Sequence, residues 1–406
     1  MRASVALFLA IAGAAHAQAA ATEFVNGRWY DGDGFRADTF FAAGGVLTKH
    51  RPAGHVIVVD LHDGYVVPPF GDAHEHFPES AASFKWSNPV FLASGTFYIL
   101  NPSEIARRTN PIRAELGGPG AVDVVFAHGG FTCTGGHPTL LFRRLIDQKY
   151  VDFPADSLEG NALYAIDSAA DIAKKWPAFL ATKPDFVKLY LLHSEEYARG
   201  APDPTSKGLK PEFLPELVRR AHAAGLRAGA HIESATDFHY AVASGVDLIM
   251  HLPGYVWRPV DTDSVFLIKD TDIRLAAERH TIVVTTIDLA DYDSAAIRDR
   301  TRRVQTENLR HLKAAGVPIV IGTDGAVGKV LNEVLDLHST GVFTDAELVR
   351  MLTVSTPQVI FPQRRIGRLA EGYEASFVVV NADPTRDVAA LKSLELRVKN
   401  GAILAP

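Results

Sequence analysis

Six residues of types that bind metal ions stand at comparable places along this chain: His74, His76, Lys188, His231, His251 and Asp324. His74 and His76 are separated by one residue, and the two-residue period of a β-strand places both side chains on the same face. Imidazole nitrogens and carboxylate oxygens are the usual ligands of Zn²⁺ and similar cations. A single strand-end histidine is more often a hydrogen-bonded structural residue, so the prediction of a metal site rests on the whole set.

Lys188 lies inside an apolar segment that is expected to be a buried strand. Burying an ammonium group costs several kcal/mol unless the group is paired or neutralised. One explanation is a carboxylate partner from elsewhere in the fold. The other is carbamylation by CO₂, which turns the amine into an anionic oxygen ligand that can bridge two cations.

A scaffold must bring these residues together, and the central part of the chain alternates strands with helices, which is typical of an α/β fold with a parallel sheet. Eight strands are expected: Pro68–His74, Thr96–Leu100, Val122–His128, Phe186–Leu192, Leu226–Ile232, Val246–Leu252, Thr281–Ile287 and Pro318–Asp324. The candidate ligands lie inside or near the ends of five of these strands, as in the active sites of (β/α)₈ TIM barrels. A doubly wound open sheet is the competing architecture. Because no Gly-rich dinucleotide fingerprint follows the first strand, we expect a closed barrel over residues 68–364.

Both ends of the chain show short apolar runs separated by turn pairs such as Asn26-Gly27 and Asn400-Gly401. Neither end alone would form a stable sheet, so we expect residues 18–67 and 365–406 to combine into one small β-sandwich. Before the chain returns to this unit, Thr344 and Glu347 form a capping box that predicts a helix.

The first residues resemble an export signal. Arg2 is followed by an apolar stretch from Val5 to Ala14 and by Ala15-His16-Ala17, a small-x-small pattern that a signal peptidase accepts. We expect residues 1–17 to be a signal peptide cleaved near Ala17, and the mature protein to be secreted or periplasmic. A membrane anchor is less consistent with a stretch this short, and a buried first strand is the remaining alternative. The one cysteine, Cys133, allows no intramolecular disulfide.

The net charge of −6 and the lack of a dense Lys/Arg stripe argue against a nucleic-acid partner. The sequence therefore favours a small-molecule or short-peptide substrate, no membrane anchor, and leaves a homo-oligomer open.

The strand-end segments resemble those of the amidohydrolase superfamily, and the likeness covers nearly all of the mature chain. The matching segments are Val67–His76 with its Asp-x-His-x-His step, Phe186–Lys188, Gly229–His231, Gly245–His251, Gly322–Asp324 and the closing segment Ile366–Ser376. Pro69 replaces a usual glycine and Ser376 stands where an aspartate is common, and neither departure removes a ligand. The chain is similar to binuclear, exported dipeptidase-like and imidazolonepropionase-like members.

The resemblance implies roles for the six residues. His74, His76 and Asp324 would hold one divalent metal ion, His231 and His251 a second, and carbamylated Lys188 would bridge them together with a hydroxide. Asp324 would also be the catalytic residue that accepts the proton from the attacking water. Zinc is the expected metal for a mainly imidazole ligand set, with manganese, cobalt or iron as alternatives.

The expected reaction is hydrolysis of a peptide-like or N-acyl amide bond, with lactone or phosphotriester hydrolysis on the same site as the alternative. The resemblance associates deaminases with a single metal and a glutamate three residues after the fifth-strand histidine, where this chain has Ser234. Glu233 instead follows His231 by two residues and is a candidate substrate or supporting group. A non-catalytic binding module would be expected to have lost ligands, whereas all six are present.

Five further residues are candidate substrate contacts because they follow the expected strands or lie in the insertion after the third: His137, Tyr190, His193, Tyr255 and Arg258. An arginine and a tyrosine beyond a metal site could hold a substrate carboxylate, although packing roles are equally compatible with the sequence. His128, at another strand end, is a further pocket candidate.

Overall fold

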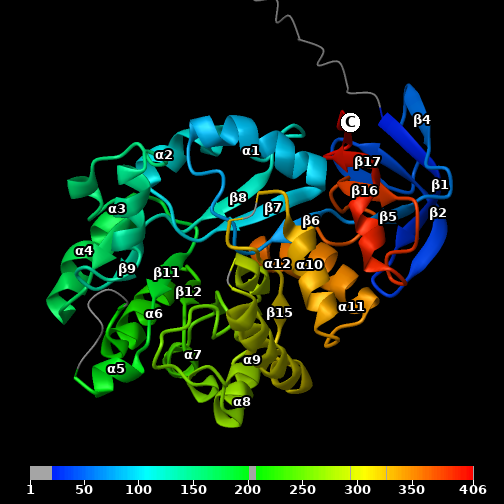
Figure 1. Cartoon of the computed structure of the whole chain (residues 1–406). Helices are drawn as coiled ribbons and strands as arrows, with labels where there is room; N and C mark the ends of the chain where they lie inside the picture. Colours follow the sequence, from blue (N-terminus) through cyan, green and yellow to red (C-terminus); the bar gives the residue numbers. More distant parts are fainter. Residues whose placement is uncertain (1–20, 201–206, 293, 326, 406) are drawn as a thin grey trace, which may run out of the picture.

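The computed structural model describes residues 21–200, 207–292, 294–325 and 327–405 (Figure 1). The predicted signal peptide, residues 1–17, lies outside the described residues. Two units are visible in Figure 1, a sheet built from both chain ends and a larger array of parallel strands and helices.

The two ends of the chain meet in one hydrogen-bonded sheet of eight strands. Its members are β1 (Ala21–Tyr30), β2 (Phe35–Ala43), β3 (Val46–Thr48), β4 (Val56–Asp60), β5 (Tyr65–Val67), β16 (Phe377–Val380), β17 (Leu394–Lys399) and β18 (Ala402–Ile403). The two halves join where β16 pairs antiparallel with β5, with Val378 opposite Val67. The predicted pairing of the two ends is therefore confirmed.

Aromatic side chains from both ends pack in the core of this sheet. The ring of Phe377 lies 4.9 Å from that of Phe24 and 5.1 Å from that of Trp29, both edge to face. Such pairs bury large apolar areas, so the C-terminal strands complete a core that the N-terminal strands cannot close alone.

The parallel strands form two sheets. One contains β6 (Phe70–Asp72), β7 (Thr96–Asn101) and β8 (Asp123–Phe126); the other contains, in spatial order, β10 (Leu163–Ala165), β9 (Gly130–Thr132), β11 (Val187–Tyr190), β12 (Ala228–His231), β13 (Leu248–Ile249), β14 (Ile282–Val284) and β15 (Ile319–Val320). Each predicted strand range contains a strand, so this part of the prediction is confirmed. The short strands β9 and β10 were not predicted, because they belong to the insertion that follows β8.

Backbone hydrogen bonds connect the two parallel sheets at both edges. Ala73 donates to the carbonyl of Ile321 over 2.8 Å, which joins the first strand to the last. At the other edge, Asp185 donates to the carbonyl of Phe126 over 2.8 Å, which joins β8 to the segment that enters β11. The ends of the first and last strands are thereby held side by side.

The helices follow the strands. The α-helices are α1 (Ala81–Ser94), α2 (Ala106–Thr109), α3 (Thr139–Asp147), α4 (Ala169–Ala181), α5 (Glu195–Ala198), α6 (Leu214–Ala223), α7 (Ala235–Ala243), α8 (Asp270–Glu278), α9 (Ala295–Ala314), α10 (Val330–Ser339), α11 (Asp345–Arg350) and α12 (Thr356–Ile360). A π-helical turn, Met351–Ser355, joins α11 to α12, and short 3₁₀ turns cover Asn110–Ala114, Ala155–Ser157, Pro211–Phe213, Asp263–Val265, Ile287–Tyr292 and Val388–Lys392. The predicted capping box is present, since the Thr344 side chain accepts a hydrogen bond from the Glu347 amide at the start of α11.

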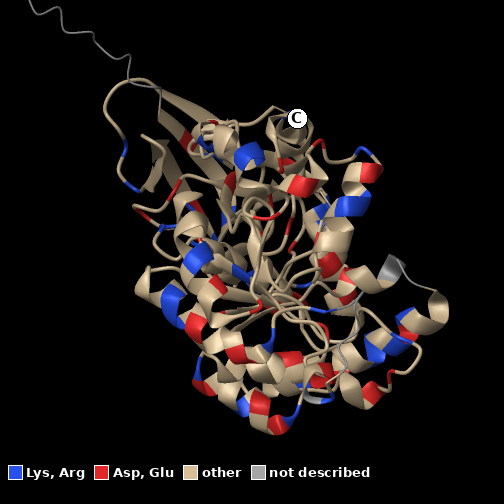
Figure 2. Cartoon of the chain, turned by 90° about the vertical axis from the view of Figure 1, so that its left-hand side faces the viewer, with Lys and Arg blue, Asp and Glu red and all other residues tan. Residues whose placement is uncertain are grey.

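Charged residues of both signs are interspersed over the helices in the view of Figure 2. Among the described residues, none of the helices combines the length and the apolar character needed to cross a bilayer.

The absence of a side chain at Gly322 allows the last strand to approach the first. A Cβ atom at this position would lie 2.5 Å from Cγ1 of Val284 and 2.8 Å from Cβ of His74. A contact below about 3 Å forces one of the partners to move, and here one partner is a candidate metal ligand.

We expect Gly322→Ala to lower the free energy of unfolding by about 1–3 kcal/mol through overpacking and to weaken metal binding by displacing His74. Denaturant unfolding and metal titration measure the two effects. Gly34→Ala is the control, because a Cβ there would meet no heavy atom within 4 Å. Equal unfolding midpoints and metal affinities for both variants would contradict the packing argument.

Candidate metal centre and pocket

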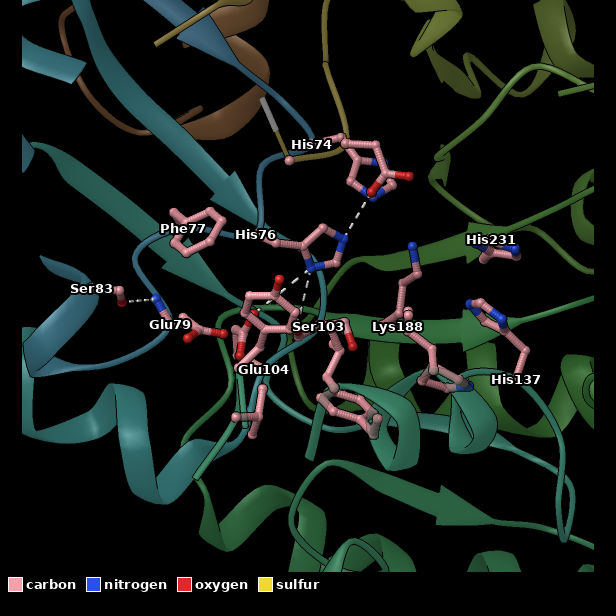
Figure 3. A pocket seen from close by; sticks show the side chains of 18 of the residues that line it. His74, His76, Phe77, Glu79, Ser83, Ser103, Glu104, His137, Lys188 and His231 are labelled. Atoms are coloured by element: carbon pink, nitrogen blue, oxygen red, sulfur yellow. Dashed lines mark hydrogen bonds and ion pairs between the residues drawn. The ribbon is translucent and has the colours of Figure 1, made fainter. Parts of the chain in front are cut away.

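The candidate ligands meet in a cavity of about 1040 Å³ at the carboxyl ends of the parallel strands (Figure 3). Its lining includes all six predicted ligands, His74, His76, Lys188, His231, His251 and Asp324. Three of the predicted substrate contacts, His137, Tyr190 and Tyr255, line it as well.

Three of the ligands form a compact group. Ligand atoms of His74, His251 and Asp324 all lie within 4.8 Å of one another. The two histidines are each 1% exposed, while the Asp324 side chain is 20% exposed and faces the cavity. Two imidazole rings and a carboxylate at this spacing can hold one cation.

The hydrogen bonding of His74 leaves its Nε2 atom as an acceptor that faces the carboxylate of Asp324. Its Nδ1 lies 2.8 Å from the carbonyl oxygen of Met250, which can only accept, so Nδ1 carries the proton. Burial lowers the pKa of His74 to about 4, so the ring is neutral at pH 7 and Nε2 is an acceptor. That Nε2 lies 3.1 Å from Oδ1 of Asp324.

The carboxylate of Asp324 is ionised. Burial raises its pKa, but the adjacent rings of His74 and His76 lower it to well below its ordinary value. Two such atoms at 3.1 Å need a shared proton or a cation between them, so this pair can hold a metal ion.

His76 repeats the arrangement on the same oxygen. Its Nδ1 lies 3.3 Å from the carbonyl oxygen of Ser103, and its Nε2 lies 2.9 Å from Oδ1 of Asp324. Nε2 of His74 and Nε2 of His76 are thus brought together on one oxygen of Asp324.

Asp72 ties the first and last strand ends into this geometry. Its Oδ1 accepts from the amides of His74 and Thr323, each over 3.1 Å, and its Oδ2 accepts from the Thr323 hydroxyl over 2.8 Å. Burial raises the pKa of Asp72 to about 7, and the bonds to His74 and Thr323 oppose this effect. The carboxyl group therefore connects the segments that carry His74 and Asp324.

The rings of His231 and His251 are adjacent, with centroids 4.5 Å apart. Nδ1 of His251 lies 3.0 Å from the Thr286 hydroxyl, which leaves Nε2 for a metal. Nε2 of His231 lies 2.8 Å from the Tyr255 hydroxyl, which leaves Nδ1. Burial lowers the pKa of both rings to well below the ordinary value, so both are neutral ligands.

His251 also lies close to the first ligand set, because its ring centroid is 4.5 Å from that of His74. The resemblance to known enzymes implied that His251 pairs with His231. The geometry places His251 between His231 and the group that contains His74.

Lys188 is 1% exposed and extends towards the space between His76 and His231 (Figure 3). Its Nζ lies 3.6 Å from Sδ of Met250 and 5.4 Å from the centroid of the Tyr190 ring. None of the ion pairs within the described part of the chain includes Lys188, so this structure offers no carboxylate partner for it. Burial lowers the pKa of Lys188 to about 7, and Asp324 partly opposes this effect.

Four residues at or near strand ends have left-handed backbone conformations that non-glycine residues rarely adopt. These are His128, His193, Thr286 and Asp324, with φ values of 58°, 47°, 47° and 64°. Such conformations persist only when the surroundings impose them, and they gather at functional sites. Two of the four belong to the site itself, as a ligand and as the partner of a ligand.

The predicted substrate contacts that line the cavity surround His231 and His251. The ring of His137 stacks on His231 at 4.6 Å between centroids, and Tyr255 stacks on His251 at 4.8 Å. Tyr190 donates its hydroxyl proton to Ser103 Oγ over 2.5 Å. These side chains are in place to contact a substrate.

His193 and Arg258, the other two predicted substrate contacts, are not among the residues that line this cavity. His193 is buried between Glu195, 3.2 Å away, and Glu233, 3.0 Å away. Burial alone lowers its pKa, but the two carboxylates raise it to about 10, so His193 is a cation. Arg258 pairs with Asp261 over 2.8 Å and with Glu196.

Glu233 does line the cavity, and the charged His193 supports it from behind. The sequence could not show that His193 and Arg258 are already paired with neighbouring carboxylates. His128 likewise lies outside the cavity lining, with Nδ1 3.1 Å from the Thr109 hydroxyl and Nε2 3.2 Å from the Arg113 guanidinium.

The sequence prediction missed the outer part of the cavity. Glu79, Glu104 and Arg108 lie beside the metal end, where Arg108 pairs with Glu79 over 3.2 Å. The lining also includes the apolar side chains of Phe77, Trp86, Leu141 and Leu145. The available signal was their position, since Phe77 and Glu79 directly follow the His-x-His segment.

Comparison with known sequences gives one family and one group of relatives. The model of the amidohydrolase family matches residues 196–403, half of this chain. The ochratoxinase of Aspergillus niger is 27% identical over 194 residues, which are 46% of this chain and 39% of that enzyme. The matched part thus spans less than half the length of this relative.

Comparison with solved structures shows the same fold over nearly the whole chain. A Xaa-Pro dipeptidase with methionine bound in its active site has a TM-score of 0.73 and 17% identity, covering 95% of this chain and 100% of its own. The A. niger ochratoxinase has a TM-score of 0.73 and 16% identity, covering 95% and 96%. A prolidase complexed with N-methylphosphonate-L-proline has a TM-score of 0.71 and 17% identity, covering 95% and 99%.

We expect Thr286→Val to weaken metal binding about tenfold, because the His251 ring loses the hydroxyl that fixes its orientation. Thr286→Ser keeps the hydroxyl and is expected to retain near-normal affinity. Competition with a chromogenic chelator measures both. If the valine and serine variants bind metal equally well, the hydroxyl does not position the ligand.

Proposed function

The chain belongs to the amidohydrolase family, and from this premise we propose that it is a metal-dependent hydrolase that cleaves a peptide-like or N-acyl amide bond. The observation that carries the proposal is the convergence of two imidazoles on Asp324, with Nε2 of His74 and of His76 at 3.1 and 2.9 Å from one oxygen. Ring nitrogens and a carboxylate at this spacing can bind a cation, and they lie in a cavity large enough for a substrate.

The residues fit a pair of divalent cations, for which we propose Zn²⁺. His74, His76 and Asp324 would hold one, His231 and His251 the other, and Lys188 would lie between them as a carbamate. Bound in this way, two divalent cations lower the pKa of a coordinated water and polarise the scissile carbonyl.

The protein groups supply binding and proton transfer. Asp324 faces the cavity and, as a general base, takes a proton from the attacking water and delivers it to the leaving nitrogen. His137 and Tyr255 stack on the two histidines of the second group and are placed to orient the amide. Glu233, held by His193, presents a further carboxylate to the same space.

Two observations support carbamylation of Lys188. The amine is buried without a carboxylate partner among the ion pairs of the described residues. Its lowered pKa increases the neutral amine, the form that attacks CO₂ to give a carbamate and a proton.

Deamination is less consistent with the site. Ser234, at the position where the deaminase pattern has a glutamate, accepts a hydrogen bond from the Asp237 amide and caps α7. The hydroxyl is therefore engaged in helix capping.

The relatives support an amide as the substrate, since their names include Xaa-Pro dipeptidase and prolidase. We propose a small-molecule or short-peptide substrate. We also propose that the parallel sheets form one closed (β/α)₈ barrel and the terminal strands a β-sandwich, which the likeness to these structures supports. Export with cleavage near Ala17 remains a proposal based on the N-terminal pattern.

We expect the metal-replete protein to contain two metal ions per chain and to hydrolyse N-acyl amino acids or dipeptides. Chelation should abolish this activity and added Zn²⁺ should restore it. Elemental analysis and a hydrolysis screen provide the measurements. One metal per chain would contradict the binuclear site, and a metal-free, inactive protein would contradict the proposed function.

We expect Lys188→Ala to reduce metal content and to lower kcat/KM by at least about 100-fold, because the bridging ligand is lost. Formate, acetate or propionate should restore part of both, since a small carboxylate can occupy the vacated space. Lys85→Ala, at an exposed position in α1, is the control. Normal activity of Lys188→Ala would rule out a bridging role.

A further inference from the structure

Several large apolar side chains that are exposed in this protein converge on the mouth of the cavity. Trp86, Leu141, Tyr150 and Val256 are 49%, 38%, 73% and 39% exposed, and all four line the cavity. Exposed apolar residues scattered singly over a surface are normal, but a convergent group at a cavity marks a binding surface.

One wall of the mouth is aromatic and follows the His-x-His segment directly. The rings of Phe77 and Trp86 contact each other edge to face, with centroids 5.0 Å apart. Because Phe77 comes one residue after the ligand His76, this wall begins at the metal end and extends outward along α1.

A second wall of the cavity is one face of α3. Leu141 and Leu145 both line the cavity, and their spacing of four residues places them on the same helix face about 6 Å apart along the axis. Next to Leu141, Phe142 is 7% exposed and packs in a small core that includes Ile105 and Leu163. That core anchors α3, so the leucines are held facing the cavity.

The two walls begin at the metal centre. His137, which stacks on His231, comes two residues before α3. The cavity volume of about 1040 Å³ is at the upper end of the range typical of small-molecule sites, and a dipeptide at the metal end would leave the apolar walls uncovered.

We propose that the outer part of the cavity binds a bulky apolar group, aromatic by preference, that the substrate carries beyond its scissile amide. The inference rests on the proposed function and specifies its substrate class: amides with a large planar apolar substituent, in preference to small dipeptides. An aromatic group in contact with Phe77 and Trp86 and with the leucines of α3 would remove apolar surface from water on both partners.

The test compares two matched substrate series on the metal-replete enzyme. The first varies the acyl group from N-acetyl to N-benzoyl to N-(2-naphthoyl) on L-phenylalanine. The second keeps N-acetyl and varies the amino acid from alanine to phenylalanine to 2-naphthylalanine. In one series, kcat/KM is expected to rise about tenfold with each added ring, and that series identifies the side of the amide that faces the walls.

Variants of the walls have matched controls on the same helices. Trp86→Ala and Leu141→Ala should each lower the ratio of kcat/KM for the largest substrate to that for the smallest by about tenfold, mainly through KM. Val90→Ala in α1 and Leu140→Ala in α3 remove equally exposed side chains, 43% and 51%, that do not line the cavity, and should leave the ratio unchanged.

Binding of 2-naphthoic acid, followed by calorimetry, tests the walls independently of turnover. Weaker binding to Trp86→Ala and Leu141→Ala than to the control variants supports the proposal, even if none of the amides is cleaved, in which case only the proposed function fails. Equal kcat/KM across both series, or equal effects of wall and control variants on selectivity and binding, would overturn the apolar site and leave the hydrolase intact.

Discussion

The convergence of two imidazole rings on one oxygen of Asp324 is the constraint on which the rest of the structure depends. The carbonyls of Met250 and Ser103 contact Nδ1 of His74 and His76, and Nε2 of both rings faces the Asp324 carboxylate. A shared proton or a bound cation offsets the cost of holding these polar atoms together. The fold opposes their separation through the backbone bond from Asp324 to the carbonyl of His74, 2.6 Å long.

Several local features serve this one arrangement. Asp72 connects the segments that carry His74 and Asp324, and Gly322 provides the space for their approach. Thr286 and Asp324 occupy left-handed backbone conformations that only their surroundings can impose. The strain is small relative to the packing of the strands, so the strand ends can present ligands in directions that regular strands would not allow.

The inner and outer ends of the cavity have different linings. At the inner end, the histidines, Lys188 and Asp324 gather their polar groups. At the outer end, apolar side chains from α1 and α3 remain exposed although burial would be favourable. The charged pair of Arg108 and Glu79 lies between the two. Reactivity and substrate preference are therefore carried by different segments, and α3, with its own small core, can vary without disturbing the ligands.

The sequence by itself determined the ligand types, their places in or near strand ends, the eight parallel strands and the joining of the two chain ends. These follow from local periodicity and from residue chemistry, which act over a few neighbouring positions. Only the tertiary structure decided which side chains share the cavity. His193 and Arg258 follow strands as Tyr190 and Tyr255 do, yet they do not line the cavity, and each pairs with a carboxylate from another segment, Glu233 and Glu196 respectively. Leu141 faces the cavity while Leu140 does not, because the packing of Phe142 sets the rotation of α3. Such outcomes depend on distances between segments far apart in the chain, which local patterns do not contain.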